Sequence, residues 1–221
     1  VAATNNGVPA NLNLNPSASQ NYDAIAGAHV FERFVAYNYR KQEFQMAGLE
    51  DWSVDSKTFT LTIREDFNWD NGDPVTALDL ITQFKLDKKM EGAIWDFAES
   101  VEQGEDDKTV VFTLKEETNP ILLKHAIGAQ GDRIYAHHPT FKEFLDKDAA
   151  ALQEYAYEKD IVGNGAFTYD SKDKQSWELS RNEEYYDAEY INFTRLQLLN
   201  RGDNTSLQQG LMGGELDGVY S

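Results

Sequence analysis

Two patterns in the sequence predict a mixed fold, α+β or α/β. The first is the alternation of apolar and polar residues that is typical of half-buried strands, as where Phe59, Leu61 and Ile63 alternate with threonines. The second is the capping box, in which Thr76 and Asp79 stand three residues apart ahead of an apolar helical face. Both patterns recur along the chain, so strands and helices are interspersed.

The same reasoning assigns the other elements in chain order. Strands are expected at residues 1–4, 57–64, 108–115, 176–181 and 195–200. Helices are expected at residues 23–37 and 76–92, from residue 120 onward, from a second capping box at Thr140 and Glu143, and at residues 206–212. The polar residues 5–21 form a long connection near the start.

The charge balance narrows the choice of partners. The chain carries 38 acidic and 20 basic side chains, for a net charge of -18. Nucleic acids and anionic membranes do not attract a polyanion, so nucleic acid is not expected as a partner. The acidic residues are spread along the chain, which favours a solvated surface and leaves a high-salt habitat open.

Metal sites and cofactors have little support in the sequence. There is no cysteine, which excludes thiolate zinc sites and cysteine nucleophiles. A calcium loop starting at Asp66 would need glycine and glutamate where Asn71 and Ala77 stand. The adjacent His137 and His138 do not have metal-ligand spacing, so surface or capping histidines are expected and no metal or cofactor is predicted.

Catalytic patterns are equally weak. Carboxylate doublets at residues 106–107, 116–117 and 183–184 could serve a glycan-active enzyme, but such doublets are usually solvated. Residues 162–167, VGNGAF, lack the lysine of a phosphate-binding loop and the third glycine of a dinucleotide fingerprint. A bend of the chain is the simpler interpretation of these glycines.

Residues 48–85 resemble the signature of the family 5 extracellular solute-binding proteins, the peptide- and nickel-type receptors of ABC importers. The segment WDNGDPVTALD, residues 69–79, follows the family pattern without a gap. Residues 162–187 and 203–221 resemble later blocks of the same family. Asn164–Phe167 replaces the usual Thr-Gly-Pro-Tyr, and Tyr186 replaces a tryptophan.

The resemblance implies a lobe of the type II periplasmic-binding-protein kind, with a mixed sheet and an inserted α+β subdomain. Residues 1–32 and 161–221 would form the core of the first lobe, and residues 33–160 would form the insert. The second lobe would lie outside this chain.

The resemblance also places candidate ligand contacts. In peptide-binding relatives an extended segment pairs with the ligand through main-chain hydrogen bonds, and by position this is Ser19, Gln20, Asn21 and Tyr22. Trp95 is a second candidate, because its ring could form a wall of the cleft; a packing role is the alternative.

The function implied is that of an extracellular or periplasmic receptor, membrane-anchored in its full-length form. It would bind oligopeptides or dipeptides and deliver them to an ABC permease in the membrane. Nickel chelates or sugars are alternative solutes. A carboxylate-based glycan-active enzyme and an interaction protein that needs only this lobe are the alternatives from other classes.

Overall fold

The computed structural model describes residues 1–4, 27–128, 133–155, 157, 159–173 and 175–220. The chain divides into two compact units, which we call the first and the second unit. The first unit comprises Val1–Phe31 and Gln153–Ser221, and the second comprises Glu32–Leu152. The predicted boundaries at residues 33 and 160 differ slightly from this division, and the inserted subdomain stays a prediction.

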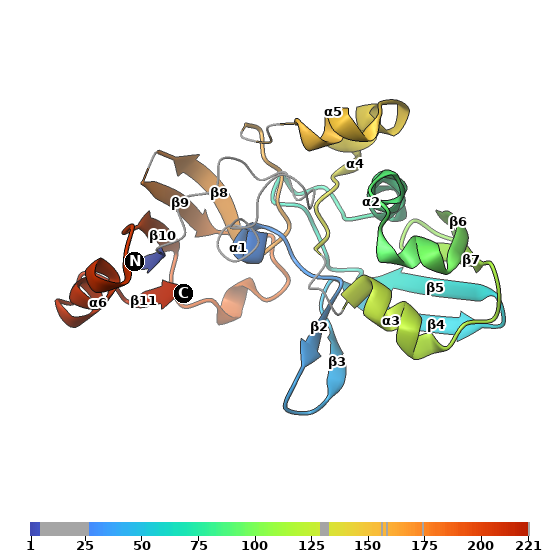
Figure 1. The fold of residues 1–221 in the computed structure, drawn as a ribbon, viewed down its shortest axis with the longest axis horizontal. Coiled ribbons are helices and arrows are strands. Elements are labelled where there is room, and N and C mark those ends of the chain that lie inside the picture. The colour runs from blue at the N-terminus through green and yellow to red at the C-terminus, as the bar shows by residue number, and fades with distance from the viewer. Residues whose placement is uncertain (5–26, 129–132, 156, 158, 174, 221) are drawn as a thin grey trace. The chain divides into compact units, whose positions relative to one another are not determined.

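The first unit is built on a five-stranded mixed sheet with the order β11-β1-β10-β9-β8 (Figure 1). Strand β1 runs parallel to β10 and β11, whereas β10, β9 and β8 are antiparallel neighbours. The elements are β1 (Ala2–Thr4), α1 (Ala28–Val30), β8 (Phe167–Lys172), β9 (Ser176–Arg181), η4 (Ala188–Tyr190), β10 (Arg195–Asn200), α6 (Asn204–Met212) and β11 (Gly218–Tyr220).

The second unit holds an antiparallel sheet with the order β4-β5-β7-β6 and a separate two-stranded sheet, β2-β3 (Figure 1). Its strands are β2 (Val35–Asn38), β3 (Glu43–Met46), β4 (Leu49–Asp55), β5 (Thr58–Ile63), β6 (Ala98–Gln103) and β7 (Thr109–Leu114). Its helices are α2 (Ala77–Lys89), η2 (Ala93–Asp96), α3 (Pro120–Gly128), α4 (His138–Phe141), η3 (Lys142–Asp146) and α5 (Ala149–Gln153), the last of which ends just past the boundary.

Each unit buries its own apolar core. In the first unit, Leu207 of α6 and Leu216 pack against Ala3. In the second unit, the ring of Phe84 on α2 meets that of Phe112 on β7 at 4.8 Å, so α2 covers one face of the four-stranded sheet. The predicted alternation of β5 is confirmed, because its apolar side chains are buried and its threonines are not.

The helix expected over residues 23–37 is wrong for the part that the structure describes, where only α1 is helical before β2 begins. The carbonyl of Val30 accepts the N–H of Gly165 at 2.8 Å, and the carbonyl of Glu32 accepts that of Ile134 at 2.8 Å. These carbonyls bond to distant segments and not to the N–H four residues further on, so the helix does not continue.

The second predicted capping box is also wrong. Helix α4 begins at His138, ahead of Thr140, and Pro139 occupies its first turn, where its missing N–H costs nothing. The hydroxyl of Thr140 lies 3.0 Å from Nδ1 of His137 and does not cap a helix. Among the helices of the described residues, none has both the length and the apolar character to span a bilayer.

Candidate functional site

Of the ligand contacts predicted from the resemblance, the structure describes only Trp95. Ser19, Gln20, Asn21 and Tyr22 lie outside the described residues, so their role stays a prediction. Trp95 is described and lies in η2 of the second unit, where it is partly exposed.

Packing contacts hold Trp95 in place. Its indole N–H donates to the carbonyl of Phe84 at 2.8 Å, and the ammonium of Lys88 lies 4.1 Å from the centre of its ring. The ring therefore helps to join η2 to α2. The predicted role of Trp95 in the wall of a ligand cleft stays a prediction.

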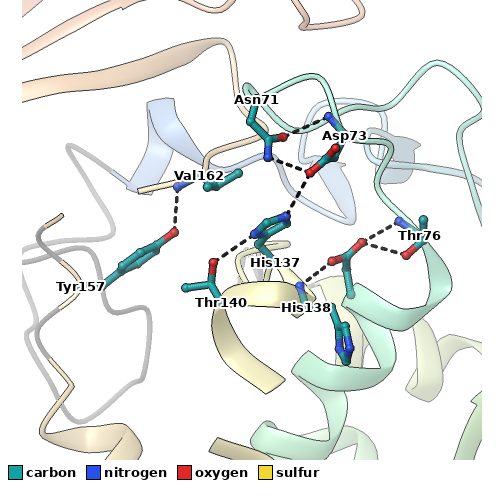
Figure 2. Close-up of polar contacts among 9 residues, drawn as sticks. Asn71, Asp73, Thr76, His137, His138, Thr140, Tyr157 and Val162 are labelled. Carbon is teal, nitrogen blue, oxygen red and sulfur yellow. Dashed lines mark hydrogen bonds and ion pairs between the residues drawn. The ribbon is translucent and has the colours of Figure 1, made fainter. Parts of the chain in front are cut away.

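The signature segment, by which we mean residues 69–79, begins as a tight polar turn. Asn71 donates from its amide to the Asp73 carboxylate at 2.8 Å and accepts the N–H of Asp73 at 3.0 Å (Figure 2). Gly72 adopts a positive φ of 86°, a conformation that glycine reaches without strain. Backbone bonds from Gly72 to Trp69 at 2.9 Å and from Trp69 to Asp73 at 2.8 Å close the turn together with these side-chain bonds.

The alternative of a calcium loop is not supported. The Arg64 guanidinium donates twice to the Asp66 carboxylate, at 2.9 Å each, and this hydrogen bonding holds the pKa of Asp66 below its usual value. That carboxylate is therefore ionised and already paired with a guanidinium. Within the described ranges, no group of three or more acidic or histidine side chains is placed to hold a metal ion.

Asp79 is a buried residue at the end of the signature segment, and it accepts several hydrogen bonds. Its carboxylate accepts the backbone N–H of Thr76 at 2.8 Å and the Thr76 hydroxyl at 3.0 Å, which confirms the predicted capping box at the start of α2. The other oxygen accepts the N–H of His138 at 2.6 Å (Figure 2). One carboxylate thereby joins the beginning of α2 to the beginning of α4.

His137 is buried, so of the two expected roles the surface position is wrong for it; it stands at the N-cap position of α4, although its side chain makes no capping hydrogen bond. Only 6% of it is exposed, and its ring meets that of Trp69 at 5.1 Å. Burial lowers the pKa of His137, and the nearby carboxylates of Asp79 and Asp73 oppose this shift. Its Nε2 lies 3.8 Å from Asp73, so the histidine contacts the turn from the α4 side (Figure 2).

In the first unit, two parts of the family-like segment 162–187 meet through Asn182. This buried side chain donates to the carbonyl of Gly165 at 2.9 Å and accepts the N–H of Glu184 at 2.9 Å. The N–H groups of Asn164 and Gly165 both bond to the carbonyl of Val30. The glycine motif thus makes a close backbone contact with α1, in agreement with the simple bend expected from the sequence.

An open hollow of about 400 Å³ lies on the sheet of the first unit. It is lined by Val1, Glu178, Arg195 and Gln197. The Glu178 carboxylate accepts from the Gln197 amide at 2.5 Å and lies 3.8 Å from the Arg195 guanidinium. Glu178 thus already contacts both polar neighbours in this hollow.

The carboxylate doublets at residues 106–107, 116–117 and 183–184 are all exposed, as expected of solvated doublets. The buried polar groups instead act as a scaffold. Asp79 and Asn182 each bind backbone groups that would otherwise be buried without partners.

This fold is that of solute-binding proteins. The structure of the mannohexaose-bound periplasmic oligopeptide-binding protein of an ABC transporter from Thermotoga maritima matches with a TM-score of 0.78 and 22% identity, covering 98% of this chain and 40% of that one. NikZ from Campylobacter jejuni, in complex with Ni(L-His), matches with a TM-score of 0.75 and 18% identity, covering 98% and 42%.

The sequence defines the family more narrowly. Residues 41–221 match the family described as bacterial extracellular solute-binding proteins, family 5 middle. The chain belongs to this family, whose members are transport receptors and not enzymes.

Two relatives of known name support this membership. The chain is 29% identical to the dipeptide-binding protein DppE of Bacillus subtilis over 203 residues, 82% of this chain and 36% of that protein. It is 26% identical to the oligopeptide-binding protein OppA of the same species over 215 residues, 88% and 38%. The chain therefore spans less than two fifths of the length of either relative.

Proposed function

We propose that the protein carrying this chain is the solute-binding receptor of an ABC importer and that it binds oligopeptides or dipeptides. The observation that carries the proposal is the similarity to a dipeptide-binding and an oligopeptide-binding protein over most of this chain. The receptor would act outside the cytoplasm, anchored to the membrane in its full-length form, and deliver its solute to the permease.

In the proposed mechanism, the backbone of residues 19–22 and the ring of Trp95 bind different parts of the ligand. Residues 19–22 would pair with an extended peptide through main-chain hydrogen bonds, which do not depend on the ligand's side chains. The exposed part of Trp95 would contact an apolar ligand group. A receptor of this kind accepts many peptide sequences.

Native mass spectrometry of the full-length protein after exposure to a mixed peptide library tests this proposal. We expect peptides of several sequences to be retained. Replacing Gln20 with proline should weaken retention because it removes a backbone donor, whereas Gln20→Ala should not. Trp95→Phe should weaken it more than Trp52→Phe, a matched change at another half-buried tryptophan that also lies under a lysine.

A nickel chelate or a sugar is the second candidate solute. The solved structures of two proteins with this fold contain mannohexaose and Ni(L-His). The same experiment with these compounds in place of peptides separates the solutes. Retention of one of them without any peptide would keep the receptor class and overturn the peptide proposal; retention of none would contradict the receptor itself.

A further inference from the structure

The second unit carries an exposed apolar surface where the β2-β3 hairpin lies beside α3. Tyr39 is 80% exposed, and Ile121 and Leu122 on α3 are 47% and 48% exposed. The Tyr37 ring meets Tyr39 at 5.0 Å and His125 at 6.2 Å, which makes the surface continuous from hairpin to helix. We call these five residues the hairpin patch.

Packed rings fix the base of the hairpin patch. Phe44 meets both Trp52 and His125 at 5.3 Å, so the hairpin is held against β4 and α3. Figure 1 shows the hairpin extending from this base away from the four-stranded sheet. The exposed rings therefore stand on a preorganised support and not on a loose loop.

Cationic side chains lie at the hairpin tip and on α3, next in the chain to residues of the hairpin patch. Arg40 and Lys41 are exposed at the tip, where their backbone N–H groups each donate to the Asn38 side chain at 3.1 Å. Lys124 lies 4.6 Å above the Trp52 ring. Within the hairpin and α3 only one carboxylate occurs, that of Glu43, which lies 3.5 Å from the Lys41 ammonium and offsets one of the three positive charges. Such a cationic rim is unusual in a chain with a net charge of -18.

Three kinds of partner can be compared for a surface of this chemistry. A second copy of the chain would bring two like-charged rims together in a symmetric contact. A nucleic acid would meet no extended basic surface and would leave the aliphatic side chains unused. Exposed leucine and isoleucine, an interfacial tyrosine and flanking lysine or arginine together fit a membrane surface that carries negative charge.

We propose that the hairpin patch is a docking surface for an anionic lipid membrane. Tyr39, Ile121 and Leu122 would enter the headgroup region, and Arg40, Lys41 and Lys124 would lie against the phosphates. The net charge of the chain opposes this contact at long range. At physiological salt the Debye length is about 8 Å, so the local cations decide the interaction at contact. This proposal is independent of the solute that the receptor binds.

Flotation of the full-length, unlipidated protein with lipid vesicles tests the proposal. We expect binding to vesicles of phosphatidylcholine with phosphatidylglycerol, weaker binding to phosphatidylcholine alone, and loss of the difference at high salt. The double variant Arg40→Gln with Lys41→Gln should lower the partition coefficient roughly tenfold or more. Leu122→Ser and Tyr39→Ser should lower binding to both kinds of vesicle.

Matched controls lie on α2 of the same unit. Lys85 is exposed and Leu78 is 49% exposed. Away from the hairpin patch, Leu78→Ser matches Leu122→Ser, and Lys85→Gln removes one positive charge where the double variant removes two. These controls should bind like the unchanged protein, and thermal unfolding should show that all variants are folded. Equal loss in controls and patch variants, or no binding to the protein-free anionic vesicles, would overturn the proposal. Binding only to membranes that contain protein would also overturn it, in favour of a protein partner.

Discussion

The family-like segments around Asp79 and around Gly165 are both anchored by buried residues, but different interactions hold them. In the second unit, side chains and backbone hold the segment together: Asp79 and Asn71 accept or donate five side-chain hydrogen bonds, beside backbone bonds such as the one that Val75 donates. In the first unit, the segment around Gly165 is held mainly by backbone, with two N–H groups on the carbonyl of Val30.

This difference indicates what the family pattern encodes. Trp69 is fully buried, Asp79 is 3% exposed and Asn182 is 1% exposed. These residues bind other parts of their own unit, so the pattern identifies a scaffold and says little about the solute. The comparison predicts that removing a hydrogen-bonding side chain lowers the free energy of unfolding most in the second unit. Adding a side-chain atom against closely packed backbone should lower it most in the first unit.

The largest effect is expected from Asp79→Ala. The change leaves the Thr76 N–H, the Thr76 hydroxyl and the His138 N–H without their buried acceptor. We expect the free energy of unfolding to fall by about 3–4 kcal/mol. Urea denaturation measures this loss. Asp96→Ala, at an exposed position of η2, is the control and should change stability little; an equally small loss for Asp79→Ala would contradict the scaffold role.

Gly165→Ala tests the backbone contact of the first unit. A Cβ atom there would lie 2.7 Å from the carbonyl carbon of Val30 and 2.9 Å from the nitrogen of Phe31, and both are backbone atoms that cannot move aside easily. We expect a loss of about 2–3 kcal/mol in urea denaturation. Gly218→Ala adds the same atom where no neighbour lies within 4 Å, so it should be close to neutral. Similar losses for both variants would mean that crowding is not the cause.

Lys89→Met sharpens the comparison, because it removes another side-chain contact of the second unit. The Lys89 ammonium donates to the carbonyls of Phe144, Leu145 and Lys147 at the end of η3. Methionine keeps the aliphatic stem but cannot donate, so we expect a loss of about 1–2 kcal/mol in thermal or urea unfolding. Lys85→Met on the exposed face of α2 should have no comparable effect.

The sequence predicted the elements whose signals are local. The capping box at Thr76 and Asp79 correctly placed the start of α2, and the alternation around Leu61 correctly placed β5. The β2-β3 hairpin was missed because its strands do not alternate between buried and exposed residues. Its rings pack instead on the next strand, β4, and on α3, which lies much further along the chain.

Contacts between distant segments could not be predicted in this way. Nothing near His137 indicates that it will be buried, because the Trp69 ring and the Asp73 carboxylate that contact it come from another part of the chain. The second oxygen of Asp79 likewise binds His138, for which the sequence offers no pattern. The capping box predicted the hydrogen bonds between Asp79 and Thr76. It could not predict the bond to His138, which depends on the tertiary fold.

The smallest effect, and the most selective, concerns pH. Burial lowers the folded-state pKa of His137 below its usual value of 6.5, while the unfolded chain keeps that value. In mildly acidic solution the unfolded chain therefore binds more protons than the folded one. It follows that the stability His137 contributes is present above pH 6.5 and is lost as the pH falls through the folded-state pKa.

His137→Gln should remove this dependence, because glutamine can still hydrogen-bond but does not titrate. We expect the free energy of unfolding of the unchanged protein to fall more steeply than that of the variant between about pH 7 and pH 5. The carboxyls with lowered pKa, such as Asp66 and Asp203, titrate at more acidic pH and do not affect this interval. If the free energy of unfolding varies with pH in the same way for both proteins, His137 has the same pKa in the folded and the unfolded chain. The side-chain network of the second unit would then not shield His137 from water. Gly165→Ala should leave the slope unchanged, because the contact that it disturbs in the first unit is made by backbone atoms that do not titrate.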